Sequence, residues 1–217
     1  MAKLGSIPAA STGTIRLTYV PEILVLKATD LTKIDSAKLN IFGVGVVLDL
    51  PQKGLKAFDG FGQVNDDSTT YVIALGNGKF LNTEAELTLT NSQAAATVEV
   101  FGFGTRKGTH LISYITEKGL TGNTMSFDKF LGLAMPDLAA NDIITAKTNV
   151  IDDVTGEKVG TFDEILTREE VRAMSTAFTW QSQNVFYNGS QLYSRVDVVL
   201  SADQTMYYSR VIDPSIQ

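Results

Sequence analysis

The sequence of 217 residues contains no cysteine and a single histidine, His110. A chain without cysteine forms no disulfide and offers no thiolate to zinc, which is typical of proteins that fold in a reducing cytoplasm. One histidine is too few for a histidine-ligated metal site, and a catalytic triad is possible only if His110 is the base. We therefore expect no catalytic residue, no metal site and no cofactor, and we expect His110 to face solvent or an interface.

Basic clusters and long apolar runs are also missing. The chain has 18 Lys and Arg against 24 Asp and Glu, and Arg106-Lys107 is the only basic dipeptide. Nucleic-acid phosphates are bound mainly by clusters of such residues, so we expect no specific nucleic-acid binding. The longest apolar run, residues 41–50, is interrupted by Asp49 and is too short for a bilayer. Residues 1–14 do not resemble a secretory signal, so we expect the mature protein to begin there.

The dominant period along the chain is two. Several segments alternate apolar and polar residues or are rich in β-branched and aromatic residues, which predicts strands: residues 14–20, 84–90, 96–103 and 195–200. Turn-forming residues separate them at short spacing, as in β-sandwiches: residues 51–54, 65–68, 76–78, 91–93, 155–157 and 187–189. The pattern therefore predicts an all-β fold made of sandwiches.

Two parts of the chain resemble each other. Residues 77–100 overlay residues 188–211 at a constant offset of 111 residues. The identical pairs are Asn77/Asn188, Gly78/Gly189, Leu81/Leu192, Leu89/Leu200, Gln93/Gln204 and Val100/Val211. A repeat of this length corresponds to a whole domain rather than to a solenoid unit. We interpret it as a duplication and predict two domains, residues 1–120 and 121–217.

A second similarity, at an offset of 104 residues, relates residues 47–59 to residues 151–163. The change of offset requires seven additional residues in the second copy, which the segment from Thr167 to Ser175 supplies. Thr167 and Glu170 have the spacing of a capping box, so this segment is predicted to contain an inserted helix from Arg168 to Ser175.

Another short helix is predicted from Ser126 to Leu133, ending before Pro136. The first dozen residues are small and polar, and we expect them to form an arm that becomes ordered only on contact with a neighbour.

Other possible sites are weaker. The carboxylate pairs Asp66-Asp67 and Asp152-Asp153 are more typical of solvated turns than of a glycosidase pair or a calcium loop, because the EF-hand spacing is missing. The motifs Gly43-Val44-Gly45 and Gly102-Phe103-Gly104 lack the dinucleotide fingerprint and indicate bulges or close packing. The late aromatic residues would suit a carbohydrate platform, but more often fill a core or an interface: Phe178, Trp180, Phe186, Tyr187, Tyr193, Tyr207 and Tyr208.

Taken with the opening Ser6-Ile7-Pro8, Gly13 and residues 15–17, the duplicated blocks and the inserted helix resemble the double jelly-roll major capsid proteins of tailless icosahedral, corticovirus-like bacteriophages. The resemblance implies two tandem jelly-roll β-sandwiches and a non-enzymatic virion protein assembled in the host cytoplasm. It also implies homotrimeric, pseudo-hexagonal capsomers that tile a shell, with other virion proteins and an internal lipid membrane as further partners.

Three alternatives remain open from the sequence. The chain could be a tandem β-sandwich adhesin or carbohydrate-binding module that uses the late aromatic residues. It could be a minor vertex, spike or tail protein, because 217 residues is short for two eight-stranded rolls. An enzyme on a jelly-roll scaffold, such as a lyase or glycosidase, is disfavoured by the single histidine.

Overall fold

The computed structural model describes residues 1–59, 68–75, 84–93, 96–103, 114–116, 120–128, 130–137, 139, 142–152, 154–170, 185–188 and 194–211. The chain divides into two compact units: unit 1 comprises residues 1–118 with 212–217, and unit 2 comprises residues 119–211. Among the described residues the helices are short, and none has the length and apolarity needed to cross a membrane.

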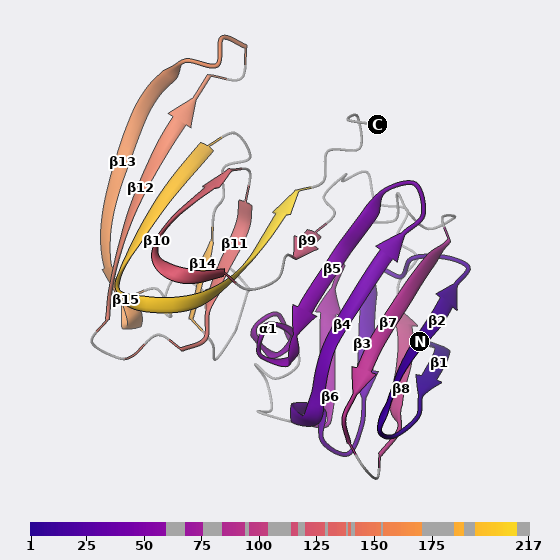
Figure 1. Ribbon diagram of the computed structural model, residues 1–217. Coiled ribbons are helices and arrows are strands. Elements are labelled where there is room, and N and C mark those ends of the chain that lie inside the picture. Colours follow the sequence, from indigo (N-terminus) through magenta and orange to yellow (C-terminus); the bar gives the residue numbers. More distant parts are fainter. Residues whose placement is uncertain are drawn as a thin grey trace. The chain divides into compact units, whose positions relative to one another are not determined.

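Unit 1 is built from short strands and two short helices. Its strands are β1 (Ala2–Ile7), β2 (Ser11–Leu17), β3 (Ile23–Lys27), β4 (Ile34–Ile41), β5 (Gly45–Pro51), β6 (Thr70–Ala74), β7 (Ala85–Asn91), β8 (Val98–Phe103) and β9 (Tyr114–Thr116). The 3-10 helix η1 (Leu31–Lys33) precedes β4, and α1 (Gln52–Ala57) follows β5. Figure 1 shows β5, β4, β7 and β2 side by side in one sheet.

The pairing of these strands is that of a long hairpin rolled up on itself. Strand β1 pairs with β8, β2 with β7, β3 with β6 and β4 with β5, all antiparallel. Rolling the hairpin adds the pairs β3–β8 and β4–β7. The result is a four-stranded sheet in the order β1-β8-β3-β6 and a second run of four strands in the order β2-β7-β4-β5, which the short strand β9 extends by a parallel pairing with β5. Eight strands in this arrangement form a jelly roll.

Alternation along the strands explains the core of unit 1. In β7, Ala85, Leu87 and Leu89 are fully buried and the residues between them are half-buried. The other sheet contributes Leu24 and Leu26 from β3, which are also fully buried. Because successive side chains of a strand point to opposite faces, this period-two pattern places one face of each sheet in the core and the other toward solvent.

Unit 2 has the same topology with fewer, longer strands. They are β10 (Leu120–Asp128), β11 (Phe130–Met135), β12 (Ile143–Ile151), β13 (Lys158–Thr167), β14 (Val185–Asn188) and β15 (Ser194–Val211). Residues 124–128 of β10 pair with residues 195–199 of β15, and residues 120–122 pair with residues 204–206. Between these two blocks the register shifts, so β10 and β15 each pass from one sheet to the other without a break.

Each of the two long strands of unit 2 therefore corresponds to two strands of unit 1. The first half of β15 pairs with β12 as β7 pairs with β4, and the second half pairs with β11 as β8 pairs with β3. The pairs β12–β13 and β11–β14 complete the second rolled hairpin. Unit 2 is thus a second jelly roll, and the merged strands explain how two rolls fit into a short chain.

The strands predicted at residues 84–90 and 96–103 are confirmed to within two residues, the strand predicted at residues 195–200 is part of the longer β15, and the strand predicted at residues 14–20 is confirmed as far as Leu17, where β2 ends. The alignment at an offset of 111 residues is also confirmed in one respect. Leu87 and Val198, which this alignment pairs, are both fully buried at corresponding positions of β7 and β15. The capping box is also confirmed, because the hydroxyl of Thr167 accepts from the amide of Glu170 and the carboxylate of Glu170 accepts from the amide of Thr167. Residues 168–170 are helical, and residues 171–175 lie outside the described residues.

Several local predictions are wrong. Residues 126–128 and 130–133 are not helical: they lie in β10 and β11, because both segments pair with β15. The first dozen residues are not a separate arm, because β1 pairs with β8 and Ile7 is buried. The expected turn at residues 51–54 continues into α1, whereas the residues aligned with α1 at an offset of 104 lie in the turn before β13 and in β13 itself. That second similarity therefore does not reflect similar structure.

Candidate functional site

The structure locates one of the polar motifs considered as a possible site. Asp152 lies in the turn between β12 and β13, where its Oδ1 accepts from the amides of Val154 and Thr155 at 2.9 and 2.7 Å. These hydrogen bonds, chiefly those from Thr155, lower the pKa of Asp152. Within the described ranges, no group of three or more His, Asp or Glu residues could hold a metal ion. Asp152 therefore caps a turn, as the sequence favoured.

Other residues considered for chemistry or binding are only partly described. Tyr207 is buried at 3% exposure, which favours a role in the core of unit 2 over a carbohydrate platform. Phe186 and Tyr187 belong to β14. Tyr208 is half-buried in β15. The other candidates lie outside the described residues: His110, Asp66, Asp67, Asp153, Phe178, Trp180 and Tyr193.

The most extensive described polar cluster in unit 1 is at the corner where β7 crosses to β8. Asn91 is only 1% exposed, and its Nδ2 donates to the carbonyl oxygens of Pro8 and Ala96, each at 2.9 Å. Its Oδ1 accepts from the amide of Gln93, whose carbonyl oxygen accepts from the amide of Ala10. One side chain thus connects the β1–β2 corner to the β7–β8 corner, where the chain changes sheets.

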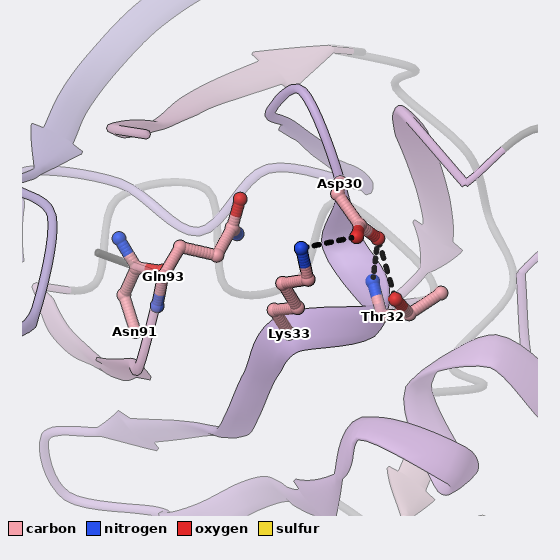
Figure 2. A network of polar contacts seen from close by, with 5 residues as sticks. All are labelled: Asp30, Thr32, Lys33, Asn91 and Gln93. Atoms are coloured by element: carbon pink, nitrogen blue, oxygen red, sulfur yellow. Dashed lines mark hydrogen bonds and ion pairs between the residues drawn. The ribbon is translucent and has the colours of Figure 1, made fainter. Parts of the chain in front are cut away.

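A second group, on the connection from β3 to β4, is shown with this corner in Figure 2. The hydroxyl and the amide of Thr32 donate to Oδ1 of Asp30, and Nζ of Lys33 lies 3.3 Å from Oδ2. The hydrogen bond from the Thr32 side chain is the largest cause of the lowered pKa of Asp30. Figure 2 shows Asn91 and Gln93 in the same region. Close by in sequence, Asp35 accepts from the hydroxyl of Ser92, which ties the start of β4 to the same corner.

Unit 2 repeats this arrangement where β15 changes sheets. Asp142 precedes β12, and its carboxylate accepts from the hydroxyl of Ser201 at 3.2 Å and from the amide of Ala139 at 2.7 Å. The Ser201 hydroxyl also accepts from the amide of Ile143. Nε2 of Gln204 lies 3.4 Å from the same carboxylate. In both units, a carboxylate at the beginning of β4 or just before β12 thus accepts a hydrogen bond from a corner serine.

Gln93 and Gln204, identical in the alignment at an offset of 111 residues, lie at these two corners. They are 4% and 7% exposed, and both belong to the few buried polar residues of the described chain. Nε2 of Gln93 and Oε1 of Gln204 have no hydrogen-bond partner in the structure. The sequence alignment found this pair, but it gave no sign that Asn91 or Asp142 would organise the corners.

A buried carboxylate in unit 1 was also not foreseen. Asp59, just after α1, is 2% exposed, and its Oδ1 accepts from the amide of Val72 at 2.6 Å. Gln52 donates to the hydroxyl of Tyr71 at 2.9 Å. Burial, and to a smaller extent the charge of Asp59, raise the pKa of Tyr71. These contacts fasten α1 to β6, so the residues hold the fold together, as the corner residues do.

Solved structures resemble the chain over nearly its whole length. The major capsid protein of Sulfolobus turreted icosahedral virus matches with a TM-score of 0.56 at 8% identity, covering 95% of this chain and 93% of that chain. The major capsid protein P2 from bacteriophage PM2 matches with a TM-score of 0.50 at 11% identity, covering 98% and 97%. The fold is a double jelly roll. No protein-family model matches the sequence, and no curated protein matches it significantly.

In this double jelly roll, the described polar side chains are used mainly to hold backbone in place. The corner carboxylates and amides bind main-chain groups or hydroxyls, and several solvent-facing charges form pairs such as Lys3–Glu99 and Arg16–Glu84.

Proposed function

We propose that this protein is a structural virion protein, the major capsid protein of an icosahedral virus. The observation that carries the proposal is the full-length match to two proteins described as major capsid proteins, which includes both rolls in tandem. Rigid sandwiches with solvent-facing sheets suit the walls of a shell, and the merged strands β10 and β15 fix the corners of the second roll without loops. The role is structural rather than catalytic, and the location is the virion.

In the finer form of the proposal, three copies form a pseudo-hexagonal capsomer, and capsomers join into the shell. Other virion proteins and an internal membrane are further partners in that shell. Two rolls per chain give a trimer six similar blocks, which is the number needed to tile a surface with near-hexagonal units. Closed rotational symmetry of this kind is how most homo-oligomers are built.

The first test is the mass of the purified protein in solution, measured by light scattering at several concentrations. We expect a trimer, and larger particles at high concentration that electron microscopy shows as shells or sheets of capsomers. A monomer at every concentration would contradict the major capsid role. A stable oligomer that never forms shells or sheets would point instead to a minor vertex, spike or tail component.

A further inference from the structure

The two sheets of unit 1 differ on their outer faces. In the β2-β7-β4-β5 run, one row across the strands is polar and consists of Thr14, Thr88, Lys38 and Asp49. The hydroxyls of Thr14 and Thr88 are hydrogen-bonded at 3.0 Å, and Nζ of Lys38 lies 3.6 Å from Asp49. This is the surface expected for a sheet that faces water.

The β1-β8-β3-β6 sheet carries apolar residues on its outer face. Val25 of β3 lies on this face, because Leu24 and Leu26 on either side of it are fully buried on the core face. The strand register places Val25 in a row that crosses the whole sheet: Lys3, Phe101, Val25 and Val72. The next row on the same face contains no charged residue: Phe103, Ile23 and Ala74.

The apolar side chains of these rows are partly accessible to solvent. Phe103 is 54% exposed. Phe101, Ile23 and Val72 are half-buried, and Val25 is buried between its neighbours. A sheet with one face in water alternates between apolar and polar residues, whereas a sheet covered on both faces is apolar on both. We call these five residues the apolar face of unit 1, and their pattern indicates a surface that another segment covers.

Charged residues border the apolar face. The third row of the sheet is polar and consists of Ser6, Glu99, Lys27 and Thr70. Nζ of Lys3 lies 2.7 Å from Glu99, and Nζ of Lys27 lies 5.8 Å from the centre of the Phe101 ring. Two lysines against one glutamate give the three rows a net charge of +1. A segment that complements this surface is therefore apolar and carries a negative charge.

Residues 212–217, with the sequence Ile-Asp-Pro-Ser-Ile-Gln, have this composition. Their apolar residues alternate with polar ones at Ile212, Pro214 and Ile216, and their single charge is Asp213. Proline has a fixed φ that suits extended backbone, and the residue before a proline is also restricted to extended conformations. The sequence of this segment therefore favours an extended chain with one apolar side.

The division of the chain into units also connects this segment to unit 1. Residues 212–217 lie outside the described residues. They directly follow β15 of unit 2 in sequence, yet they belong to the compact unit 1. An extended chain from Ile212 to Ile216 spans about 13 Å, and β8 and β6 lie two strand spacings of about 4.8 Å apart. The segment is thus long enough to cross the apolar face.

We propose that residues 212–217 bind across the apolar face of unit 1 as a strap. Ile212 and Ile216 contact the aromatic and aliphatic side chains of the face, and Asp213 faces its lysines. The segment that follows the second roll thereby stabilises the first roll. The proposal concerns a contact within one chain and goes beyond the virion role, so failure of either proposal leaves the other standing.

The first experiment measures how well the apolar face is covered. The chain has no cysteine, so V72C places a unique thiol in the face, and its rate of reaction with a maleimide reports how often the face is open. We expect deletion of residues 212–217 to raise this rate at least about tenfold, because burial of one isoleucine side chain is worth a factor of that order. In the full-length V72C chain, I216S should also raise the rate, whereas S215A should leave it unchanged.

The matched control is S36C, which places the thiol at a half-buried position on the outer face of the other sheet. Its reaction rate should be the same with and without residues 212–217. Circular dichroism and thermal unfolding verify that each variant is folded, and I216S replaces the deletion if the shortened chain misfolds. A V72C rate that neither the deletion nor I216S raises overturns the proposal. A rate that depends on protein concentration instead of on the segment identifies a second copy as the cover, and also overturns it.

The second experiment locates the segment. Lys3 and Lys38 form a matched pair, because each is an exposed lysine in an ion pair on the outer face of a different sheet. In K3C/S215C and K38C/S215C, a short bismaleimide joins the two thiols when they lie close together. We expect K3C/S215C to cross-link at least about tenfold faster, because the docked strap holds its thiol near position 3.

Mixing ¹⁵N-labelled and unlabelled protein separates cross-links within one chain from cross-links between copies. We expect cross-links within one chain for K3C/S215C. Equal rates for the two double variants, or cross-links that form only between copies, overturn the proposal.

Discussion

At the scale of single residues, Asn91 shows why a jelly roll needs buried amides at its corners. A strand that leaves one sheet for another ends its ladder of hydrogen bonds, and the carbonyl groups at that point need new partners. The amide of Asn91 supplies them for Pro8 and Ala96 while accepting from Gln93. Among neutral side chains, only the carboxamide can donate two hydrogen bonds from its nitrogen and also accept at its oxygen.

The substitution Asn91→Asp tests this role. The carboxylate cannot donate, so two carbonyl oxygens lose their partners and face a buried negative charge. We expect the free energy of unfolding at pH 7 to fall by about 3 kcal/mol, measured by urea denaturation. Burial would raise the pKa of the new carboxyl group in the folded state, so the loss should shrink as the pH is lowered toward about 4.

The matched control is Asn40→Asp, the same chemical change at a half-buried position of β4. It should change the free energy of unfolding by less than about 1 kcal/mol. Equal losses for the two variants would show that the corner amide has no special part in stability.

Asp30 provides a test by pH. Its lowered pKa stabilises the folded state above the unfolded-state pKa of about 3.9, and this contribution is lost as the pH falls through the folded-state pKa. In Thr32→Val the largest cause of the shift is removed, so we expect the pKa of Asp30 to move up toward its ordinary value in an NMR titration. Lys33→Gln should produce a smaller rise, and an unchanged pKa in Thr32→Val would contradict this explanation.

At the scale of strands and helices, the sequence predicts elements well where local pattern and pairing agree. Residues 84–90 alternate, and they form β7 with its apolar residues in the core. Residues 126–128 and 130–133 show the opposite case. They belong to a segment that suggested a helix, but they lie in β10 and β11 through pairing with residues roughly 70 to 80 positions away in β15. Pairing across such distances is invisible to a local pattern, and so was the continuity of β15 through residues 201–204.

Glycine turns are another case in which the sequence identified an unusual backbone position but did not predict which structure it would adopt. Gly43 and Gly45 were expected to form a bulge or a close contact, and they form the turn between β4 and β5 with φ angles of 81° and 106°. A Cβ added at either position would meet no atom within 4 Å, so the whole cost of a side chain comes from the backbone.

We expect Gly43→Ala and Gly45→Ala each to lower the free energy of unfolding by about 1 kcal/mol or more, with the larger effect at Gly45. Gly160→Ala is the control, because Gly160 lies in β13 without a positive φ and also has open space around its Cα. Chemical denaturation should show little change for this variant. A similar loss at all three positions would mean that backbone conformation is not the cause.

At the scale of the whole molecule, the rolled hairpin of unit 1 is completed by β8. This strand pairs with β1 on one side and β3 on the other, so the sheet is continuous only when β8 is present. The two domains predicted from the repeat stay a prediction, which the folding of separate fragments can test.

We therefore expect a fragment of residues 1–118 to fold on its own, with dispersed amide signals in an NMR spectrum and a cooperative thermal transition. A fragment of residues 1–91, which ends before β8, should show neither. An unfolded 1–118 fragment would mean that the two units depend on each other for stability.

The merged strands of unit 2 have a consequence for engineering and for natural variation. Where unit 1 joins β7 to β8 through a connection at residues 92–97, unit 2 passes through the same corner inside the hydrogen-bonded strand β15. A foreign peptide or a new epitope inserted there would interrupt the continuous strand β15 between its pairing with β12 and its pairing with β11. In the second roll, natural insertions are therefore expected only in its other connections. In the first roll, they are also expected in the connection between β7 and β8.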